Sequence, residues 1–205
     1  FLYPTINHIY DENGKKQTMQ HLLASDQKDR WERALSNEFG RFAKGNIHGV
    51  AHTDSIDFIY KKDVPKNQKV TYATFVCDHR PLKSEQWRVR CVVGGDILLY
   101  DENTSSPAAS MMDTKIMLNS VISDACRGAR FLSADLKDFF LGSRMKTAEY
   151  VRIPYNIFPA DIIKTYNLAD KVCEDGYIYI RIKKGMYGLK QAAILAYNQL
   201  KNHLK

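Results

Sequence analysis

The chain has 205 residues, of which 44% are hydrophobic and 26% are charged. This composition is typical of a globular domain and excludes an intrinsically disordered chain, and the absence of any run of about 18 apolar residues excludes a membrane-spanning helix. The formal net charge of +7 favours nucleic acid as a partner, because a basic surface attracts phosphates, although many basic proteins bind no anion.

Residues 1–24 are mixed and polar and predict an irregular or partly helical leader. The chain begins with Phe1, and no charged and then apolar leader follows, so no signal peptide can be read. We therefore expect the start to be a cut inside a longer polypeptide that is not secreted. The 4 cysteines and 6 histidines lack ligand spacing, which predicts buried free thiols in a reducing compartment and no zinc site.

The next segment, up to residue 95, predicts one helix and three strands. From Asp26 to Gly45, apolar residues recur at helical spacing (Trp31, Ala34, Leu35, Phe39 and Phe42), and packing in a core is the simplest reason for them. Strands are expected at 56–60, 70–77 and 86–93, the last two forming a hairpin around a charged loop. In the third strand Arg88 and Arg90 point to the face opposite Trp87, Val89, Cys91 and Val93.

The remaining elements mix helices and strands without strict alternation. Ser106 as N-cap and Pro107 at the first helical position predict the start of a helix, and Gly128 its end. Residues 130–136 predict a strand, 159–168 a short helix, 177–183 a strand, and residues from about 190 a final helix with Ala193, Tyr197, Leu200 and Leu204 on one side. This order gives an α+β fold class.

Two short segments carry residues suited to chemistry. Asp135 ends the predicted strand 130–136, where rigid backbone can aim a carboxylate at a divalent metal, although an aspartate that caps a turn gives the same pattern. Around Tyr187, the glycines of 184–191 let a planar group or a phosphate approach the backbone, although a plain strand-to-helix turn has the same composition.

Together the two segments resemble copia-type retrotransposon reverse transcriptases. Residues 135–142 are similar to that family's Asp-Val-Lys-x-Ala-Phe-Leu-x-Gly motif, and residues 186–192 to its Leu-Tyr-Gly-Leu-Lys-Gln-Ala-Pro motif. The link 149–154, the helix from Trp31 to Glu38, the strand 88–95 and the turn 106–108 are also similar to the family's counterparts. The resemblance covers residues from about 25 to the end, with all pieces in the family's order.

The resemblance implies a right-hand polymerase fold in two parts: a leader at 1–24, and at 25–205 a partial reverse transcriptase domain. That domain would hold the fingers and part of the palm, with an incomplete palm sheet and no thumb. Its reaction is RNA-directed DNA synthesis, in which two Mg²⁺ ions about 3.5–4 Å apart assist attack of a primer 3′-hydroxyl on a deoxynucleotide. The implied partners are an RNA or DNA template-primer, a deoxynucleoside triphosphate and the rest of a polyprotein. The implied place is the cytoplasm, within virus-like particles, with no membrane.

The resemblance also assigns roles to single residues. Asp135 is implied as the catalytic metal ligand, assisted by the backbone carbonyl of Leu136. The nucleotide would contact the backbone N–H groups of Asp138 and Phe139, the ring of Phe140, which excludes a 2′-hydroxyl, and the pair Tyr187 and Gly188. Arg88 or Arg90 would hold the triphosphate, the choice staying open. Lys190 would contact template or phosphate, although a solvated helix-start lysine is equally expected.

Two departures and one absence limit the expected activity. Phe139 replaces a small alanine beside the nucleotide, and Ala193 replaces a proline. The family's Tyr-x-Asp-Asp motif is missing, so one of three metal aspartates is present and we expect no polymerisation by this chain alone. The alternatives are a non-catalytic nucleic-acid-binding or decayed remnant of the same fold, and an unrelated basic α+β domain.

Overall fold

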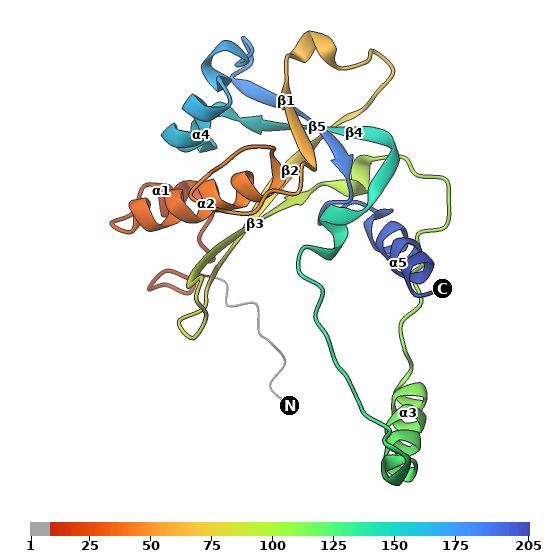
Figure 1. Ribbon diagram of the computed structural model, residues 1–205. Coiled ribbons are helices and arrows are strands. Elements are labelled where there is room, and N and C mark those ends of the chain that lie inside the picture. The colour runs from red at the N-terminus through yellow and green to blue at the C-terminus, as the bar shows by residue number, and fades with distance from the viewer. Residues whose placement is uncertain (1–8) are drawn as a thin grey trace.

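A computed structural model describes residues 9–205 (Figure 1). Two helices open this part of the chain, α1 (Met19–Leu23) and α2 (Lys28–Phe42). α2 has the predicted amphipathic pattern, and its side chains at Trp31, Leu35 and Phe39 are buried. α1 lies inside the predicted leader, whose residues 1–8 fall outside the described part.

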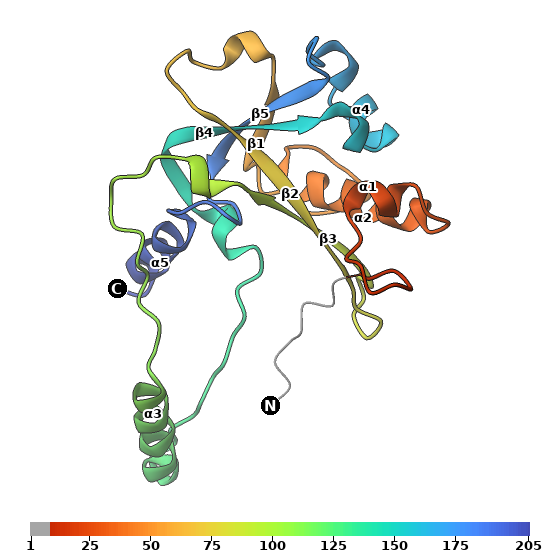
Figure 2. The same cartoon turned by 180° about the vertical axis from the view of Figure 1, so that it is seen from behind.

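Five strands form one curled sheet with the order β1-β5-β4-β2-β3 (Figures 1 and 2). The strands are β1 (Ile56–Ile59), β2 (Val70–His79), β3 (Trp87–Val93), β4 (Arg144–Pro154) and β5 (Tyr177–Lys184). β2 pairs in parallel with β4 through residues 70–72, and it pairs antiparallel with β3 through residues 73–79. Because β2 divides its length between two neighbours, the sheet bends along this strand and brings the β2–β3 hairpin under α2.

One face of the sheet holds the core. β5 contributes Ile178, Ile180 and Ile182 to it, and α2 and α4 (Ala160–Thr165) lie over them. Phe39 of α2 packs against Phe158, just before α4, with ring centroids 4.7 Å apart and the rings tilted by 32°. The predicted helix α2 and strands β1, β2, β3 and β5 are therefore confirmed, and so is the mixed helix-and-strand class.

The predicted start of α3 is wrong. α3 spans Met111–Ser123 and begins after Ser110, not after Ser106. Ser110 accepts a hydrogen bond from the backbone N–H of Asp113 at 3.0 Å, and the Asp113 carboxylate reaches back to the Ser110 N–H at 3.1 Å. This reciprocal capping box stabilises the later start, because a lone Ser106-Pro107 lacks a third-position acid to complete it.

The strand predicted at 130–136 is also absent from the described structure. These residues are irregular, and Phe131 and Leu132 are 51% and 87% exposed. No neighbouring strand pairs with them within residues 9–205, and β formers without a ladder partner form no strand. In Figures 1 and 2 they lie in a long excursion that carries α3 away from the sheet.

β4 was not predicted as a strand. Its first half is polar, and a register shift between Arg144 and Glu149 interrupts the alternation that marks a strand. The final helix α5 (Ala192–His203) buries Ala192 and Ala196, whereas the predicted face member Leu204 is 78% exposed. No helix within residues 9–205 has the length and apolar character needed to cross a bilayer.

Candidate functional site

A hollow of about 810 Å³ lies between the C-terminal half of α2, the β2–β3 hairpin and residues 135–138. Segments far apart in the chain meet there because β3 ends beside the turn that follows β5. Its lining includes five of the residues assigned from the sequence: Arg88, Asp135, Leu136, Asp138 and Tyr187.

Glu38 of α2 anchors one wall of the hollow. Its side chain is 1% exposed and accepts a hydrogen bond from Arg41 at 2.6 Å and one from the backbone N–H of Cys91 at 3.1 Å. Arg88 lies 3.4 Å away on the same carboxylate. Since β3 is an edge strand and its Cys91 N–H points away from β2, Glu38 satisfies an edge donor that would otherwise be buried without a partner.

The same cluster continues toward solvent through Glu85. Its carboxylate accepts from Arg88 at 2.8 Å and lies 3.5 Å from both Arg41 and Arg80. Asp138 adds a third acid, 3.7 Å from Nε of Arg41. Three guanidinium groups therefore share four carboxylates, the fourth being Asp78, which lies 3.9 Å from Nε of Arg80. Guanidinium groups suit bidentate binding of phosphate oxygens.

Burial sets the protonation of the inner part of this cluster. Burial raises the pKa of Glu38, and Arg88 and Arg41 oppose that rise. The pKa of Tyr187 is also raised, first by burial and then by the charges of Glu38 and Asp138, with Arg88 and Arg90 acting in the opposite direction. Tyr187 thus stays a neutral hydroxyl and lies within electrostatic reach of both acids and both arginines.

The Tyr187–Gly188 turn docks on the backbone of β3. The Tyr187 carbonyl accepts a hydrogen bond from the Val93 N–H at 2.8 Å. Gly188 has φ of +93°, and a Cβ at this position would lie 2.0 Å from the Val93 carbonyl oxygen. The space next to Gly188 is therefore filled by β3, which accounts for the glycine through protein packing and not through a ligand.

Phe139 and Phe140 lie in a short 3₁₀ turn, Phe139–Gly142, whose Leu141 is fully buried. Phe140 packs edge-to-face against Tyr187 with ring centroids 5.5 Å apart, and Phe139 lies 6.0 Å from Phe140. Phe140 and Tyr187, whose rings were both expected to contact the nucleotide, thus form one aromatic pair. Asp138, which precedes the turn, has φ of +54°, a conformation uncommon for a residue other than glycine.

Five assigned residues do not line the hollow, namely Arg90, Phe139, Phe140, Gly188 and Lys190. Arg90 is half-buried, does not line the hollow, and pairs in register with Val76. Nζ of Lys190 donates to the Leu98 carbonyl at 2.8 Å, so this lysine fastens the chain after β3 to the start of α5. Arg88, in contrast, lies at the hollow but is already bound by Glu38 and Glu85.

Asp135 reaches the hollow from irregular backbone. The prediction that it ends a strand is wrong. Its side chain is exposed, and together with Asp138 and the Leu136 carbonyl it offers the oxygen ligands that Mg²⁺ takes, usually one or two carboxylates plus water. Within residues 9–205, no three His, Cys, Asp or Glu side chains group closely enough to hold a metal ion.

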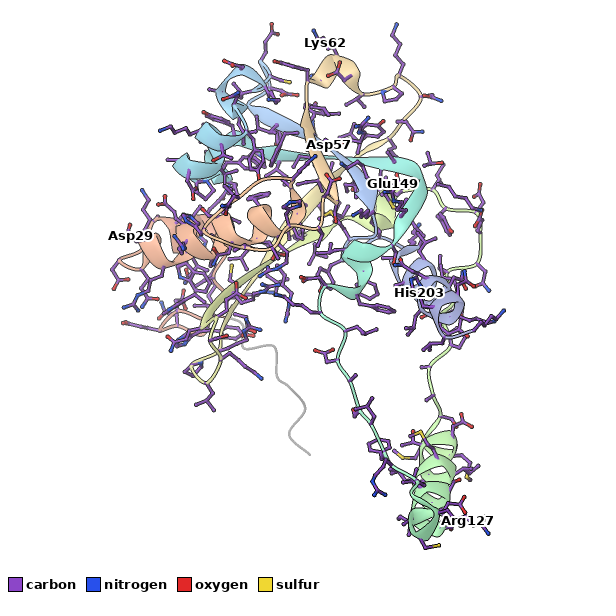
Figure 3. All side chains as sticks on the ribbon, viewed as in Figure 1. Asp29, Asp57, Lys62, Arg127, Glu149 and His203 are labelled. Carbon is purple, nitrogen blue, oxygen red and sulfur yellow. The ribbon has the colours of Figure 1, made fainter. Side chains whose placement is uncertain are left out.

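The sequence analysis assigned no role to Glu38 or Glu85, nor to the hydrogen-bonded pair Gln191 and Glu149. Nε2 of Gln191, which is buried, donates at 3.1 Å to the carboxylate of Glu149. Figure 3 labels Glu149 on β4. Both residues stand inside segments that carried the family resemblance, yet nothing in their spacing links them. Burial raises the pKa of Glu149, and the hydrogen bond from Gln191 opposes that rise.

Comparisons with models of known protein families, with curated protein sequences and with solved structures found no match for this chain.

Proposed function

We propose that this chain is part of an RNA-directed DNA polymerase of the copia retrotransposon type, and that the hollow at Asp135 binds a deoxynucleoside triphosphate. The observation that carries the proposal is the meeting of Asp135, Asp138, Arg88 and Tyr187, from three separate motif segments, around one hollow. Motifs that matched by accident would have no reason to converge in space.

The arrangement suggests a role for each wall. Asp135, with the Leu136 carbonyl, would hold Mg²⁺ bound to the triphosphate, and the ion would neutralise charge that develops on the phosphates. Arg88 is the triphosphate candidate over Arg90, because it lines the hollow and its partner Glu85 is 29% exposed. An incoming phosphate would displace Glu85 and leave the buried pair with Glu38 in place.

The Phe140–Tyr187 pair supports a preference for deoxyribose. A rigid ring beside the sugar excludes the 2′-hydroxyl by contact, and the edge-to-face packing at 5.5 Å fixes the Phe140 ring. Asp135 is the one residue here that corresponds to the family's three metal aspartates, and it cannot hold two Mg²⁺ ions against their repulsion. The proposed contribution of these 205 residues is therefore binding, without polymerisation.

A decayed or non-catalytic remnant of the same fold is the second candidate. It is favoured by the irregular backbone at 130–136 and by Phe139, a bulky ring in place of a small residue. A remnant would retain nucleic-acid affinity and lose selective, Mg²⁺-dependent nucleotide binding.

Calorimetric titration with dATP and ATP in Mg²⁺ tests the proposal. We expect dATP to bind several-fold more tightly than ATP, and Phe140→Ala to remove that difference. Asp135→Asn should weaken dATP binding in Mg²⁺ and leave metal-free binding unchanged, whereas Asp101→Asn, another exposed aspartate, should change neither. Equal affinities for the two nucleotides in the wild-type chain would refute the proposal.

A further inference from the structure

The start of β4 bulges out of the sheet. Arg144 pairs with Lys184 of β5, and the next pair is Glu149 with Ile182, so β4 uses five steps where β5 uses two. A hollow of about 470 Å³ lies at this bulge, lined by five cationic side chains and one carboxylate, namely Arg144, Lys146, Arg181, Lys183, Lys184 and Asp54. Bulges of this kind redirect side chains and are often found beside binding sites.

The cations of the bulge hollow are only partly neutralised. Lys183 binds Asp54 at 2.7 Å and Asp57 at 2.9 Å, and Arg181 shares Asp57 at 2.7 Å. Lys146 binds Glu102 at 3.0 Å. Five cations therefore face three carboxylates, an excess of two positive charges within the described residues. Figure 3 places Asp57 on β1, beside β5.

The two unmatched cations are Arg144 and Lys184. Lys184 donates to the Thr53 carbonyl, and no carboxylate of residues 9–205 lies within ion-pair distance of Arg144. They stand directly opposite each other in the β4–β5 register, an arrangement of like charges that destabilises a sheet. An anion bound between them would convert this repulsion into attraction.

The bulge hollow is close to the hollow at Asp135. Residues 51, 138 and 187 line the hollow at Asp135, and residues 54, 144 and 184, each close to one of them in the chain, line the bulge hollow. Two of these pairs are three residues apart, so their Cα atoms are at most about 10 Å apart. The two hollows therefore draw on neighbouring stretches of the same three segments.

We infer that the bulge hollow binds the backbone phosphates of a single-stranded nucleic acid that passes the hollow at Asp135. The inference rests on the proposed function for its choice of nucleic acid. Long, flexible side chains from two strands line an open surface, and this suits a continuous phosphate backbone better than one enclosed phosphate, for which backbone N–H groups usually form a cradle.

Fluorescence anisotropy with labelled single-stranded RNA and DNA of about 12 nucleotides tests the inference, in the absence of Mg²⁺ and nucleotide. We expect Arg144→Gln to weaken binding about tenfold at low salt. The slope of log K against log salt should become shallower by about 0.7, because the variant binds one phosphate fewer. Lys115→Gln, which removes an exposed charge on the remote α3, is the control for net charge and should weaken binding less than about twofold.

Two other results would overturn the inference. Equal losses of affinity from Arg144→Gln and Lys115→Gln would mean that only net charge matters. Binding of tripolyphosphate that depends on Arg144, without oligonucleotide binding, would mean a small-anion site. Thermal melting of each variant distinguishes misfolding from the removal of one phosphate ligand. If Arg144 matters for oligonucleotides while dATP and ATP bind equally, the polymerase proposal fails and this surface remains.

Discussion

The buried contacts of Glu38 give a structural reason for the pattern of residues from Trp31 to Glu38. The segment from Trp31 to Glu38 suggested only a family resemblance and a core-facing helix. In the structure Trp31, Ala34 and Glu38 are buried on α2, and the acid binds two arginines and the edge of β3. Trp31 packs edge-to-face on Trp87 of β3 with ring centroids 4.9 Å apart, and the Glu38 carboxylate reaches Cys91 of the same strand.

Replacing Glu38 should be costly. In Glu38→Gln one charge of a buried ion cluster is lost, and Arg41 keeps only its longer contacts with Glu85 and Asp138. We therefore expect a loss of about 3 kcal/mol in the free energy of unfolding. Urea denaturation measures it. Glu32→Gln makes the same change on the same helix, where Glu32 pairs with Lys28 in solvent, and should cost less than about 0.5 kcal/mol. Similar losses in both variants would contradict the role assigned to Glu38.

Among the elements, those with a self-contained pattern were predictable. α2 has its apolar stripe and β5 alternates Ile178, Ile180 and Ile182 with polar residues, so their periods alone define them. β4 was missed because a bulge interrupts its alternation, and the strand at 130–136 was predicted in error because propensity cannot supply a pairing partner. The local sequence pattern therefore identifies α2 and β5, whereas tertiary pairing determines whether β4 and residues 130–136 form strands.

The turn after β5 is an element defined by its contact with β3. Gly188→Ala places a methyl group against the Val93 carbonyl and forces a left-handed residue, so we expect a loss of about 3 kcal/mol in unfolding free energy. Gly128→Ala separates the two causes, because Gly128 also has positive φ but no atom within 4 Å of its Cβ position, and it should cost about 1 kcal/mol. Equal costs in denaturant titrations would show that backbone conformation alone explains both glycines.

At the scale of the whole molecule, the sequence predicted four residues that meet in space, but not the contacts that hold them there. Asp135, Asp138, Arg88 and Tyr187 were assigned from linear motifs, and they line one hollow. Their supports were not predictable, since Glu38, Glu85 and the docking of Gly188 on β3 join segments distant in the chain. The assignment of Lys190 shows the limit, because its amine is bound to Leu98.

The excursion at residues 99–137 distinguishes this molecule from a uniformly packed domain. No side chain of α3 is buried, and large apolar residues such as Met111, Ile122 and Leu132 are exposed. A segment with so few buried contacts opens at little cost in free energy, so proteases should cut there first. We expect brief trypsin treatment to cleave after Arg127 or Arg130 before any site in β1 to β5.

The two halves should then stay together. β2 from the first half pairs with β4 from the second, and the Tyr187 carbonyl binds Val93 of β3, so the sheet crosses the cut. Mass spectrometry after denaturation should find two fragments, while gel filtration under native conditions should find one particle. Arg127→Gln combined with Arg130→Gln should slow the first cut without changing the melting temperature, because neither side chain is buried. First cleavage within the β2–β3 hairpin would show that the excursion is packed. Separation of the halves on the column would show that the sheet is not continuous across the cut.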